Sequence, residues 1–449
     1  MKIIFIPVIQ SFIARSILGT DAFDNIRHDL NIRFVIFAPH YKVDFYKEKF
    51  NQPNIVIEGI EPSKFDRSAN SIFQELAILM LPTYFVRYRM KERNLGIIRY
   101  AVSMAINYVL APWHIFHQIL RFLDRTFTST QKYDLFFEKY KPDLVFSPDI
   151  FNQDDAVLLM AARKHGTKTL GMVRSWDCTT NKNLLRSIPS KIIVNNELIK
   201  EELVRLHDVE DQTVVPVGFP QFDHFINPKL SSREEFFKEI GVDPGRRLIL
   251  IAPGGKALTD TDWEFCDMLK RGMDDGRLPD DVHVLIRNHP QSSTDLSKFQ
   301  NNGRFIVDNP GQIVGGHRRA AEMLEADILH AANSLAYCEL LISLNTSLGL
   351  DILNFDKPHI MLGFDGYEKK PFEKSVRRYH REDNMKNFIE SGAVCLAHNP
   401  EELVEFTRAY LKDPSLDADG RERARKEILY RTDGRAGERV AEAILDSLT

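Results

Sequence analysis

The sequence predicts an α/β protein of two domains, each a doubly wound parallel sheet covered by helices. The chain has 449 residues, which is too many for one compact core. In both halves, short and nearly continuous apolar runs alternate with segments of helical spacing, as in parallel sheets that are covered on both faces. Proline, glycine and serine thicken at 217–236, and a second series of strand-like runs begins at 246. We therefore expect one domain at 1–220 and another at 221–415.

The first half contains six strand-like runs, each followed by polar or turn-forming residues. Between the last two runs before residue 174, "DDAVLLMAARKHG" (154–166) has helical spacing and ends in glycine, as helices often do. Another helix-like segment, "ELIKEELVRLHDV", follows the sixth run. The predicted strands are 2–8, 33–39, 54–60, 142–149, 167–173 and 190–196.

The second half repeats this pattern and ends in helices. The segment "PEELVEFTRAYLKD" (400–413) has helical spacing, and the charge-rich segment 416–449 predicts a C-terminal helix with a solvated face. The predicted strands are 246–256, 281–290, 303–308, 338–347, 358–364 and 392–398.

Net charge, cysteine spacing and the N-terminal apolar run argue against a nucleic-acid-binding protein, a disulfide-stabilised protein and a signal peptide. The formal net charge of -4 gives no basic field to gather nucleic acid, so no nucleic-acid partner is expected. Four scattered cysteines form no CxxC pair, which favours reduced thiols in a cytoplasmic protein. The N-terminal apolar run is only Ile3 to Ile9, is broken by Pro7 and lacks a small-residue cleavage site. A buried first strand therefore explains it better than a signal peptide.

Residues 72–130 interrupt the alternation and predict a helical insert in the first domain. From Tyr100 to Leu120 there is no formal charge, which suggests a transmembrane helix, but polar residues such as Asn107 within the stretch count against one. Several basic residues precede it. Besides a true span, two interpretations are open and favoured over it: a basic, aromatic, amphipathic segment at 72–123 that lies on the inner face of a membrane, and an ordinary buried helical pair.

Polar residues after the strands of the second domain form the candidate ligand site, because open parallel sheets bind ligands beyond the carboxyl ends of their strands. Gly254, Gly255 and Lys256 follow the strand in "LILIAPGGK". Paired glycines let backbone N–H groups approach a phosphate, and the lysine adds charge. This signal is weak alone, because glycine turns are common, and the spacing of a Walker loop is absent.

The next strand ends in "LIRNHPQSS", which places Arg287, Asn288, His289, Ser292 and Ser293 after it. Arginine is a fixed cation, and histidine can donate a hydrogen bond to a phosphate oxygen. An isolated histidine is more often structural than ligand-binding. Because an arginine and two serines stand beside His289, the two roles are about equally favoured here.

A third strand end carries Asn345, Thr346 and Ser347, followed by helix-like "LGLDILNF". Such residues cap helices, and a helix N-terminus also attracts anions. Asp351, one turn further on, could bond a ribose hydroxyl or serve only as a solvated or capping residue. Three strand ends of this kind predict a phosphate site.

The segment "GMVRSWDCTTNK" (171–182) follows a predicted strand of the first domain and is unusually rich in side chains that can hold a ligand. Trp176 could stack on a sugar or base, although packing explains such a tryptophan more often. The side chains of this segment that can hold a ligand are Arg174, Ser175, Trp176, Asp177, Thr179, Thr180, Asn181 and Lys182, and the site candidates chosen from them are Arg174, Ser175, Trp176, Asp177 and Lys182.

Together, the glycine turn, the R-x-HP strand end, the Ser/Thr-rich turn with its helix and the linker "VVPVGFPQFDHF" (214–225) resemble glycosyltransferases of the GT-B architecture. The HP strand end is similar to that of sialyltransferases, Kdo transferases and CDP-glycerol glycerophosphotransferases. The "RSWDCTTNK" segment resembles a loop of uncharacterised proteins encoded among surface-polysaccharide genes. This resemblance covers about residues 140–400. It implies two Rossmann-like domains that face each other across a cleft, with 416–449 crossing back to the first domain.

The resemblance also implies a function: transfer of a sugar from a nucleotide-sugar donor to a surface glycan or a lipid-linked acceptor. The second domain would hold the donor, and the segment 171–182 would meet the acceptor or the transferred group. The implied phosphate contacts are Gly254, Gly255, Arg287, His289, Thr346 and Ser347.

Transfer needs the charge of the leaving group to be neutralised, which Lys256, Arg287 and His289 can do. No Asp-x-Asp motif stands at a strand end in a metal-binding context, so neither a metal nor another cofactor is expected. An inverting reaction also needs a base. Asp177 is the predicted base, with Asp149 and Asp154 as rivals, although Asp177 could equally order its loop.

Three alternatives stay open. The first is glycerophosphate transfer from CDP-glycerol, in which His289 would act with His317 or His330. The second is a sugar-nucleotide epimerase on the same two-domain plan. The third is a non-catalytic nucleotide-binding partner in a polysaccharide assembly complex.

Overall fold

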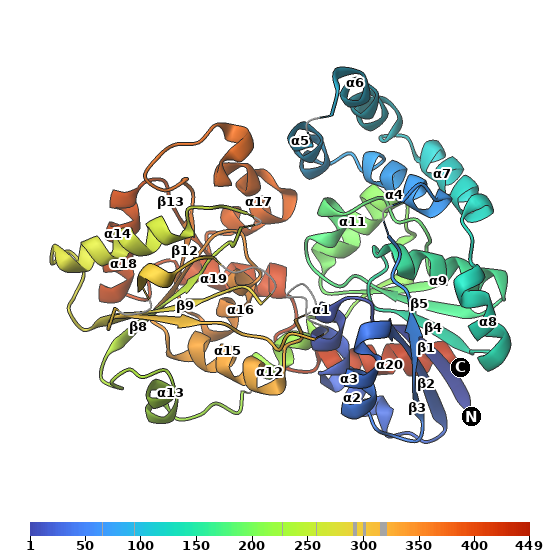
Figure 1. Ribbon diagram of the computed structural model, residues 1–449, viewed down its shortest axis with the longest axis horizontal. Helices are drawn as coiled ribbons and strands as arrows, with labels where there is room; N and C mark the ends of the chain where they lie inside the picture. Colours follow the sequence, from blue (N-terminus) through green and yellow to red (C-terminus); the bar gives the residue numbers. More distant parts are fainter. Residues whose placement is uncertain are drawn as a thin grey trace. The chain divides into compact units, whose positions relative to one another are not determined.

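The computed structural model describes residues 1–64, 66–93, 95–226, 228–256, 258–290, 294–299, 302–314 and 321–449. They form two compact units. The first unit comprises Met1–Asp223 and Arg435–Thr449, and the second unit comprises His224–Gly434. Residues 416–434, expected within the returning C-terminal segment, thus belong to the second unit. Each unit has one parallel sheet with helices on both faces (Figure 1).

The sheet of the first unit has seven strands in the order β3-β2-β1-β4-β5-β6-β7, and neighbouring strands are parallel. Its central strands are buried on both faces, which explains their continuous apolar runs. β7 lies in the stretch that the sequence suggested as a linker. The strands are β1 Lys2–Pro7, β2 Ile32–Pro39, β3 Ile55–Ile60, β4 Leu144–Ser147, β5 Lys168–Met172, β6 Lys191–Val194 and β7 Val214–Pro216.

The sheet of the second unit has six strands in the order β10-β9-β8-β11-β12-β13, again with parallel neighbours. In both sheets the strand order reverses once, between β1 and β4 and between β8 and β11. The strands are β8 Arg247–Ala252, β9 Val282–Arg287, β10 Phe305–Asp308, β11 Leu340–Ser343, β12 His359–Leu362 and β13 Cys395–Ala397.

Polar caps begin many of the helices. The Asn152 side chain accepts the Asp154 N–H at the start of α9, and the Asn196 side chain accepts the Ile199 N–H at the start of α11. The helices of the first unit are α1 Ser11–Ile13, α2 Asp21–Arg27, α3 Val43–Lys49, α4 Ala69–Leu79, α5 Tyr84–Glu92, α6 Ile97–Ala105, α7 His114–Phe127, α8 Gln131–Tyr140, α9 Gln153–Lys164, α10 Cys178–Asn181, α11 Glu197–His207 and α20 Ala436–Leu448.

The helices of the second unit surround its sheet in the same way. Ser232 and Glu235 form a capping box at the start of α13. The run after Ser347, expected to be a helix, is one α-helical turn (α16) followed by a 3₁₀ turn, Ile352–Phe355. The helices are α13 Arg233–Glu239, α14 Asp262–Asp274, α15 Glu325–Tyr337, α16 Leu348–Asp351, α17 Asp383–Glu390, α18 Pro400–Lys412 and α19 Ala418–Ala424; α12 Asp223–Ile226 spans the boundary between the units.

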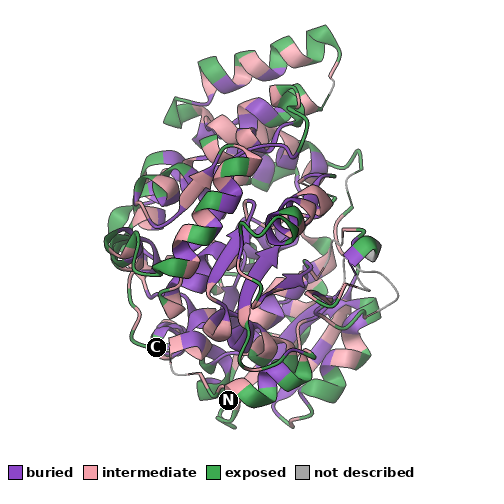
Figure 2. Cartoon of the chain, turned by 90° about the vertical axis from the view of Figure 1, so that its left-hand side faces the viewer, coloured by how far each residue is buried: buried purple, intermediate pink, exposed green. Residues whose placement is uncertain are grey.

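The C-terminal helix α20 packs against α2 in the core of the first unit. The Asp223 carboxylate accepts the N–H groups of Ala436 and Gly437 at its start, at 3.2 and 2.7 Å. A Cβ atom at Gly437 would lie 2.8 Å from the Ala22 backbone nitrogen, so glycine permits this close approach. Figure 2 shows buried residues concentrated in the sheets, with exposed residues on the outer faces of the helices.

Helices α4 to α7, with the π-helical turn Ile106–Leu110, form the insert between β3 and β4 (Figure 1). Asn107, a polar residue that counted against a membrane span, donates to the carbonyls of Leu79 and Leu81 at 2.8 Å each. It therefore ties the π-helical turn to the end of α4. Within the described parts of the chain, every helix is too short or too polar to traverse a lipid bilayer.

Candidate functional site

A pocket of about 530 Å³ lies at the carboxyl edge of the first sheet, and we call it the edge pocket. Segments that follow β1, β3, β4 and β5 form one part of its wall, on both sides of the point where the strand order reverses. Helices α4 and α5 of the insert form the other part. Doubly wound sheets bind ligands at this point, so the edge pocket is the candidate site of the first unit.

The edge pocket combines positive charge, amide groups and an apolar surface. Lys182 supplies positive charge, and so do Arg89 and Arg93, which also pair with Glu92 and Glu75 of the insert; such charge suits a phosphate. Amides and hydroxyls suit the hydroxyl groups of a polyol or sugar. The amide and hydroxyl side chains are those of Gln10, Ser63, Gln74, Asn152, Gln153, Asn181 and Asn183, and the apolar ones are those of Ile9, Ile78, Leu79, Phe85, Val86, Met90 and Phe151.

Asp154, one rival for the role of base, also lines the edge pocket. Its carboxylate accepts the backbone N–H of Ser63 at 3.0 Å and the Ser63 hydroxyl at 2.7 Å. The Lys132 ammonium forms an ion pair with the same carboxylate. Three donors thus occupy Asp154, which fixes the segment after β3 to the start of α9.

A buried ion pair holds the insert over the edge pocket. The Arg186 and Asp124 side chains are each 1% exposed and make two hydrogen bonds, of 2.7 and 2.8 Å. Arg186 also donates to the amide oxygens of Asn70 and Gln74, and Gln74 donates to Asn183. The network therefore joins α4 and α7 to the loop after β5.

The segment 171–182 uses its arginine internally. The Arg174 guanidinium lies 2.9 Å from the Asp149 carboxylate and over the ring of Phe12. Burial opposes the charge, but the neighbouring Asp149 outweighs it and raises the pKa of Arg174. Asp149, the other rival base, is only 2% exposed. Arg174 and Asp149 therefore form a largely buried pair.

The predicted base Asp177 accepts the Ser175 hydroxyl at 2.5 Å, and its backbone carbonyl accepts the Asn181 N–H at 2.9 Å. This is the loop-ordering arrangement weighed against catalysis. Trp176 beside it is buried, with 9% of its surface exposed. Ser175, Trp176 and Asp177 thus share in the packing of their own loop, and they do not line the edge pocket.

The threonines of this segment are also held by their neighbours. His207 in α11 donates to the Thr179 carbonyl at 2.8 Å, and burial lowers the pKa of His207 to about 3. The Thr179 hydroxyl donates to Glu202, and Thr83 donates to the Thr180 carbonyl at 2.8 Å. These bonds fasten the segment to α11 and to the insert.

Lys182 is the predicted acceptor-side residue that lines the edge pocket, whereas Arg174, Ser175 and Trp176 do not. Asn181, which the sequence offered as a ligand-capable group but not as a site candidate, lines it as well, and so does Asn183, which was missed. The α5 residues of the pocket were missed because their basic, aromatic sequence was interpreted as a membrane face or as part of an ordinary buried helical pair.

In the second unit, the backbone N–H groups of the predicted glycine turn are hydrogen-bonded to a side chain of the protein itself. The N–H groups of Gly254 and Gly255 donate to the two oxygens of Asp262, at 2.9 and 2.8 Å, and the Thr294 hydroxyl donates at 2.6 Å. Burial raises the pKa of Asp262. In this arrangement a carboxylate takes the place foreseen for a phosphate, while Lys256 is exposed beside it.

Arg287 is buried and belongs to an ion-pair network. Its guanidinium pairs with Asp308 and donates to the Asp327 carbonyl at 3.1 Å. His330 lies between Asp308 and Glu239, at 3.3 and 2.7 Å. Burial opposes its charge, but these carboxylates raise the pKa of His330. The predicted phosphate contact Arg287 and the candidate acid–base residue His330 thus both serve this network.

His289 is exposed after β9, as a ligand-facing residue must be, and Asn288 beside it is buried. Asn288 donates to the Asn309 side chain at 2.8 Å, and its own amide oxygen is buried without a hydrogen-bond partner. The predicted residues Ser292, Ser293 and His317 lie outside the described residues.

At the third predicted strand end, some polar side chains are hydrogen-bonded within the protein and one is exposed to solvent. The Thr346 hydroxyl accepts the Leu348 N–H at 3.0 Å, and Ser347 is exposed. Asn345 donates to Glu382 at 3.3 Å. Asp351 is 2% exposed, which leaves little of it for a ribose hydroxyl to reach.

Solved structures resemble the whole chain at low sequence identity. UDP-GlcNAc 2-epimerase from Neisseria meningitidis, bound to UDP-GlcNAc, matches with a TM-score of 0.58 and 12% identity over 99% of this chain and 100% of that one. The S. aureus MnaA–UDP structure matches with a TM-score of 0.56 and 11% identity over 99% and 96%. The wall teichoic acid polymerase TagF with CDPG matches with a TM-score of 0.51 and 12% identity over 100% and 88%. These similarities establish the GT-B fold.

The family follows from a match between the sequence and a family model. No curated protein matches the chain. A family model described as CDP-glycerol:poly(glycerophosphate) glycerophosphotransferase matches residues 154–446, which is more than half of the chain. The chain therefore belongs to the CDP-glycerol:poly(glycerophosphate) glycerophosphotransferase family and is a GT-B transferase that uses a nucleotide-activated donor.

Proposed function

We propose that the chain transfers glycerophosphate, or a similar polyol phosphate, from a CDP-activated donor to an acceptor hydroxyl held in the edge pocket. The family match over residues 154–446 carries this proposal. The edge pocket supports it, because its amides and cations suit a chain of hydroxyls and phosphates.

In this reaction the acceptor oxygen attacks the β-phosphorus of the donor. The bond from that phosphorus to the oxygen of the α-phosphate breaks, CMP leaves with the electron pair, and a base takes the acceptor proton. We assign His289 to proton transfer, because it is exposed at a strand end, and Lys256 to the charge that grows on CMP.

The released nucleotide tests this reaction. The protein is incubated with CDP-glycerol or UDP-GlcNAc and a lipid-anchored glycerophosphate primer, and released nucleotides are separated by chromatography. We expect CMP from CDP-glycerol, and a fall of about 10²–10⁴-fold in its release in His289→Ala. His398→Ala, an exposed histidine of the same unit, is the control. Release of UDP would instead indicate glycosyl transfer, and conversion of UDP-GlcNAc without release would indicate an epimerase.

Acceptor binding in the edge pocket has its own test. Lys182→Ala removes a cation from the pocket, whereas Lys64→Ala removes an exposed cation that adjoins the pocket without lining it. We expect Lys182→Ala to raise the KM for the primer about tenfold or more, as for a lost hydrogen bond to a charged group. The KM for CDP-glycerol should not change. Equal effects of the two substitutions would place the acceptor elsewhere.

We propose also that the insert rests on an anionic membrane surface and that the acceptor is lipid-linked. Large apolar side chains on the insert are exposed: Ile97 by 89%, Ile98 by 82% and Trp113 by 63%. Between residues 96 and 128 the one acidic side chain, Asp124, is buried in its pair with Arg186. Arg125 and Arg99 are exposed, and Arg99 also pairs with Glu75 of α4. An apolar face with positive charge suits anionic lipid.

Co-sedimentation with vesicles of phosphatidylcholine and phosphatidylglycerol tests this contact. The variant carries Ile97→Ser, Ile98→Ser and Trp113→Ser. The control carries Leu30→Ser, Leu135→Ser and Ile313→Ser, which are exposed apolar residues outside the insert. We expect the variant to stay in the supernatant and the control to pellet like the original protein. If the variant and the control pellet to the same extent, or if neither pellets, the proposed membrane contact is wrong.

We propose finally that the transfer step needs no divalent metal. An Asp-x-Asp motif does follow β8, but Asp262 is bonded to the glycine amides and Asp260 pairs with Lys370. Rates of CMP release with and without added Mg²⁺ test this expectation. A rate that depends on Mg²⁺ would overturn it.

A further inference from the structure

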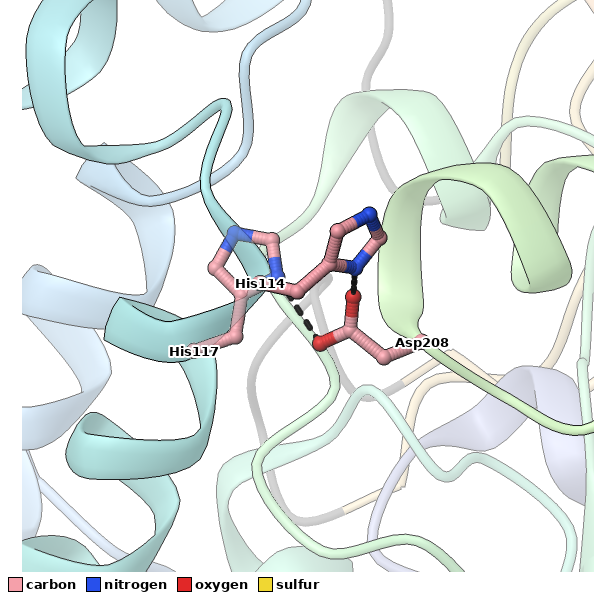
Figure 3. Close-up of side chains that lie close together, drawn as sticks. All are labelled: His114, His117 and Asp208. Carbon is pink, nitrogen blue, oxygen red and sulfur yellow. Dashed lines mark hydrogen bonds and ion pairs between the residues drawn. The ribbon is translucent and has the colours of Figure 1, made fainter.

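Two histidines and an aspartate converge where the insert meets the rest of the first unit (Figure 3). His114 and His117 lie three residues apart in the first turn of α7, so their rings share one face of the helix. Asp208 follows the last residue of α11 in a left-handed conformation, with φ of 54°. The three residues each offer one ligand atom, and these atoms lie within 4.8 Å of one another.

The two ring nitrogens that face the carboxylate are both Nδ1. His117 Nδ1 lies 2.9 Å from one oxygen of Asp208, and His114 Nδ1 contacts the other oxygen. Asp208 therefore stands between the two rings. Arg121 donates to the oxygen near His117 at 2.7 Å, which adds positive charge on one side of the carboxylate.

The other nitrogen of His117 fixes where its proton lies. Nε2 is 2.8 Å from the Ala111 carbonyl oxygen, which can only accept, so Nε2 carries the hydrogen. In a neutral ring Nδ1 then points a lone pair at the Asp208 oxygen. Such a contact needs a positive centre between the two atoms, which is either a second proton or a metal ion. A ring whose far nitrogen donates to a carbonyl is the usual state of a metal-binding histidine.

We infer that His114, His117 and Asp208 bind a divalent transition-metal ion such as Zn²⁺. Two imidazole nitrogens and one carboxylate oxygen are a ligand set that Zn²⁺ and its neighbours in the first row accept. The His114 side chain is 61% exposed, so the ion can enter from solvent and keep a water ligand. The ion would join the start of α7 to the end of α11 and so fasten the insert.

Metal titration of the full-length, tag-free protein after chelator treatment tests this site. We expect isothermal titration with Zn²⁺ to show one ion per chain, and Co²⁺ to give a visible absorption band that Zn²⁺ removes. His114→Ala alters an exposed side chain and should weaken Zn²⁺ binding by more than about tenfold, since losing a residue that only orients a metal ligand already costs about that much. Asp208→Asn should do the same.

The control is His398→Ala, which removes an exposed histidine that also faces a carboxylate, that of Glu402. It should leave Zn²⁺ binding unchanged. If the original protein binds no stoichiometric Zn²⁺, or if His114→Ala binds it as tightly as the original, the site holds protons and not a metal. Either result overturns the inference.

Discussion

Polar groups bond to one another at the carboxyl edges of both sheets, and the strand order reverses in the same way in both, but the first edge also encloses a pocket. At the first edge, helices of the insert stand over the strand ends and leave a pocket of about 530 Å³. At the second edge, the polar groups named above mostly bond to each other: the Gly254 and Gly255 amides to Asp262, Arg287 to Asp308 and Asn345 to Glu382. The same reversal of strand order thus marks a candidate site in each unit, but it does not determine the chemistry of either site.

The difference also shows what a ligand would meet at each edge. In the first unit the edge pocket already presents Lys182 and several amides. In the second unit a donor phosphate that used the glycine amides would have to displace the Asp262 carboxylate, which competes for the same N–H groups. Substitutions at the two edges therefore separate the groups that hold the fold from those that hold a ligand.

The largest expected effect is at the first edge, in Arg186→Met. This change leaves Asp124 charged, buried and without its guanidinium partner. We expect the free energy of unfolding to fall by about 3–5 kcal/mol, as for other broken buried ion pairs. Urea denaturation, followed by circular dichroism, measures it.

The matched control is Lys270→Met, which breaks an exposed pair with Asp274 on α14. It should change the free energy of unfolding by less than about 1 kcal/mol. If Arg186→Met is as mild as this control, the buried network does not hold the insert over the edge pocket.

The second edge should respond more moderately, in Asp262→Ala. This change leaves the N–H groups of Gly254 and Gly255 without their acceptor. We expect a loss of about 1–3 kcal/mol in the free energy of unfolding, the usual penalty of unsatisfied buried donors. Asp260→Ala removes an aspartate two residues away, whose side chain is 83% exposed, and should have almost no effect. Equal effects would mean that the carboxylate of Asp262 does not stabilise the glycine turn.

Most of the fold could be predicted from the sequence because its strands are buried on both faces. All six strands expected in each half are present, since runs such as "KIIFIPV" have few other uses. β7 was missed because its three residues open the proline- and glycine-bearing run 214–225, which was interpreted as the linker between the domains.

The candidate site could be predicted less well, because polar side chains serve the fold and the ligand alike. Arg174 and Thr179 drew attention as ligand groups, yet Asp149 and Glu202 hold them. No sequence pattern reveals these long-range partners. The edge pocket depends on α4 and α5 packing over the strand ends, which is also a long-range event. Strand-end position therefore predicted the region of the site better than it predicted the residues.

A smaller effect concerns pH and Asp155, which lies beneath the first edge. Burial, and then the charge of Asp149, raise the pKa of Asp155 well above its ordinary value of about 3.9. The unfolded chain therefore loses this proton at a lower pH than the folded chain does. Its contribution to stability is fully present below about pH 4 and declines as the pH rises towards the folded pKa.

In Asp155→Asn the side chain cannot ionise, so this variant should lack the decline in stability with rising pH. We expect the difference in free energy of unfolding, original minus variant, to fall between pH 4.5 and pH 8 in urea titrations. Asp281→Asn is the control, because Arg247 lowers the pKa of Asp281, so the contribution of Asp281 changes only below about pH 4. A constant difference for Asp155→Asn would show that Asp155 is ionised throughout this range.

The smallest expected effect on stability is that of Asp177→Asn, which decides whether the predicted base belongs to the loop or to the reaction. The amide oxygen can still accept the Ser175 hydroxyl, so the free energy of unfolding should change by less than about 0.5 kcal/mol. Because Asp177 does not line the edge pocket, we expect CMP release to stay within about threefold of the original rate, under 1 kcal/mol in the barrier. A fall of about 10²–10⁴-fold with unchanged stability would establish the carboxylate as the base. The acceptor hydroxyl would then lie beside the loop and not in the edge pocket, and the presence of a pocket at the first edge would no longer locate the chemistry.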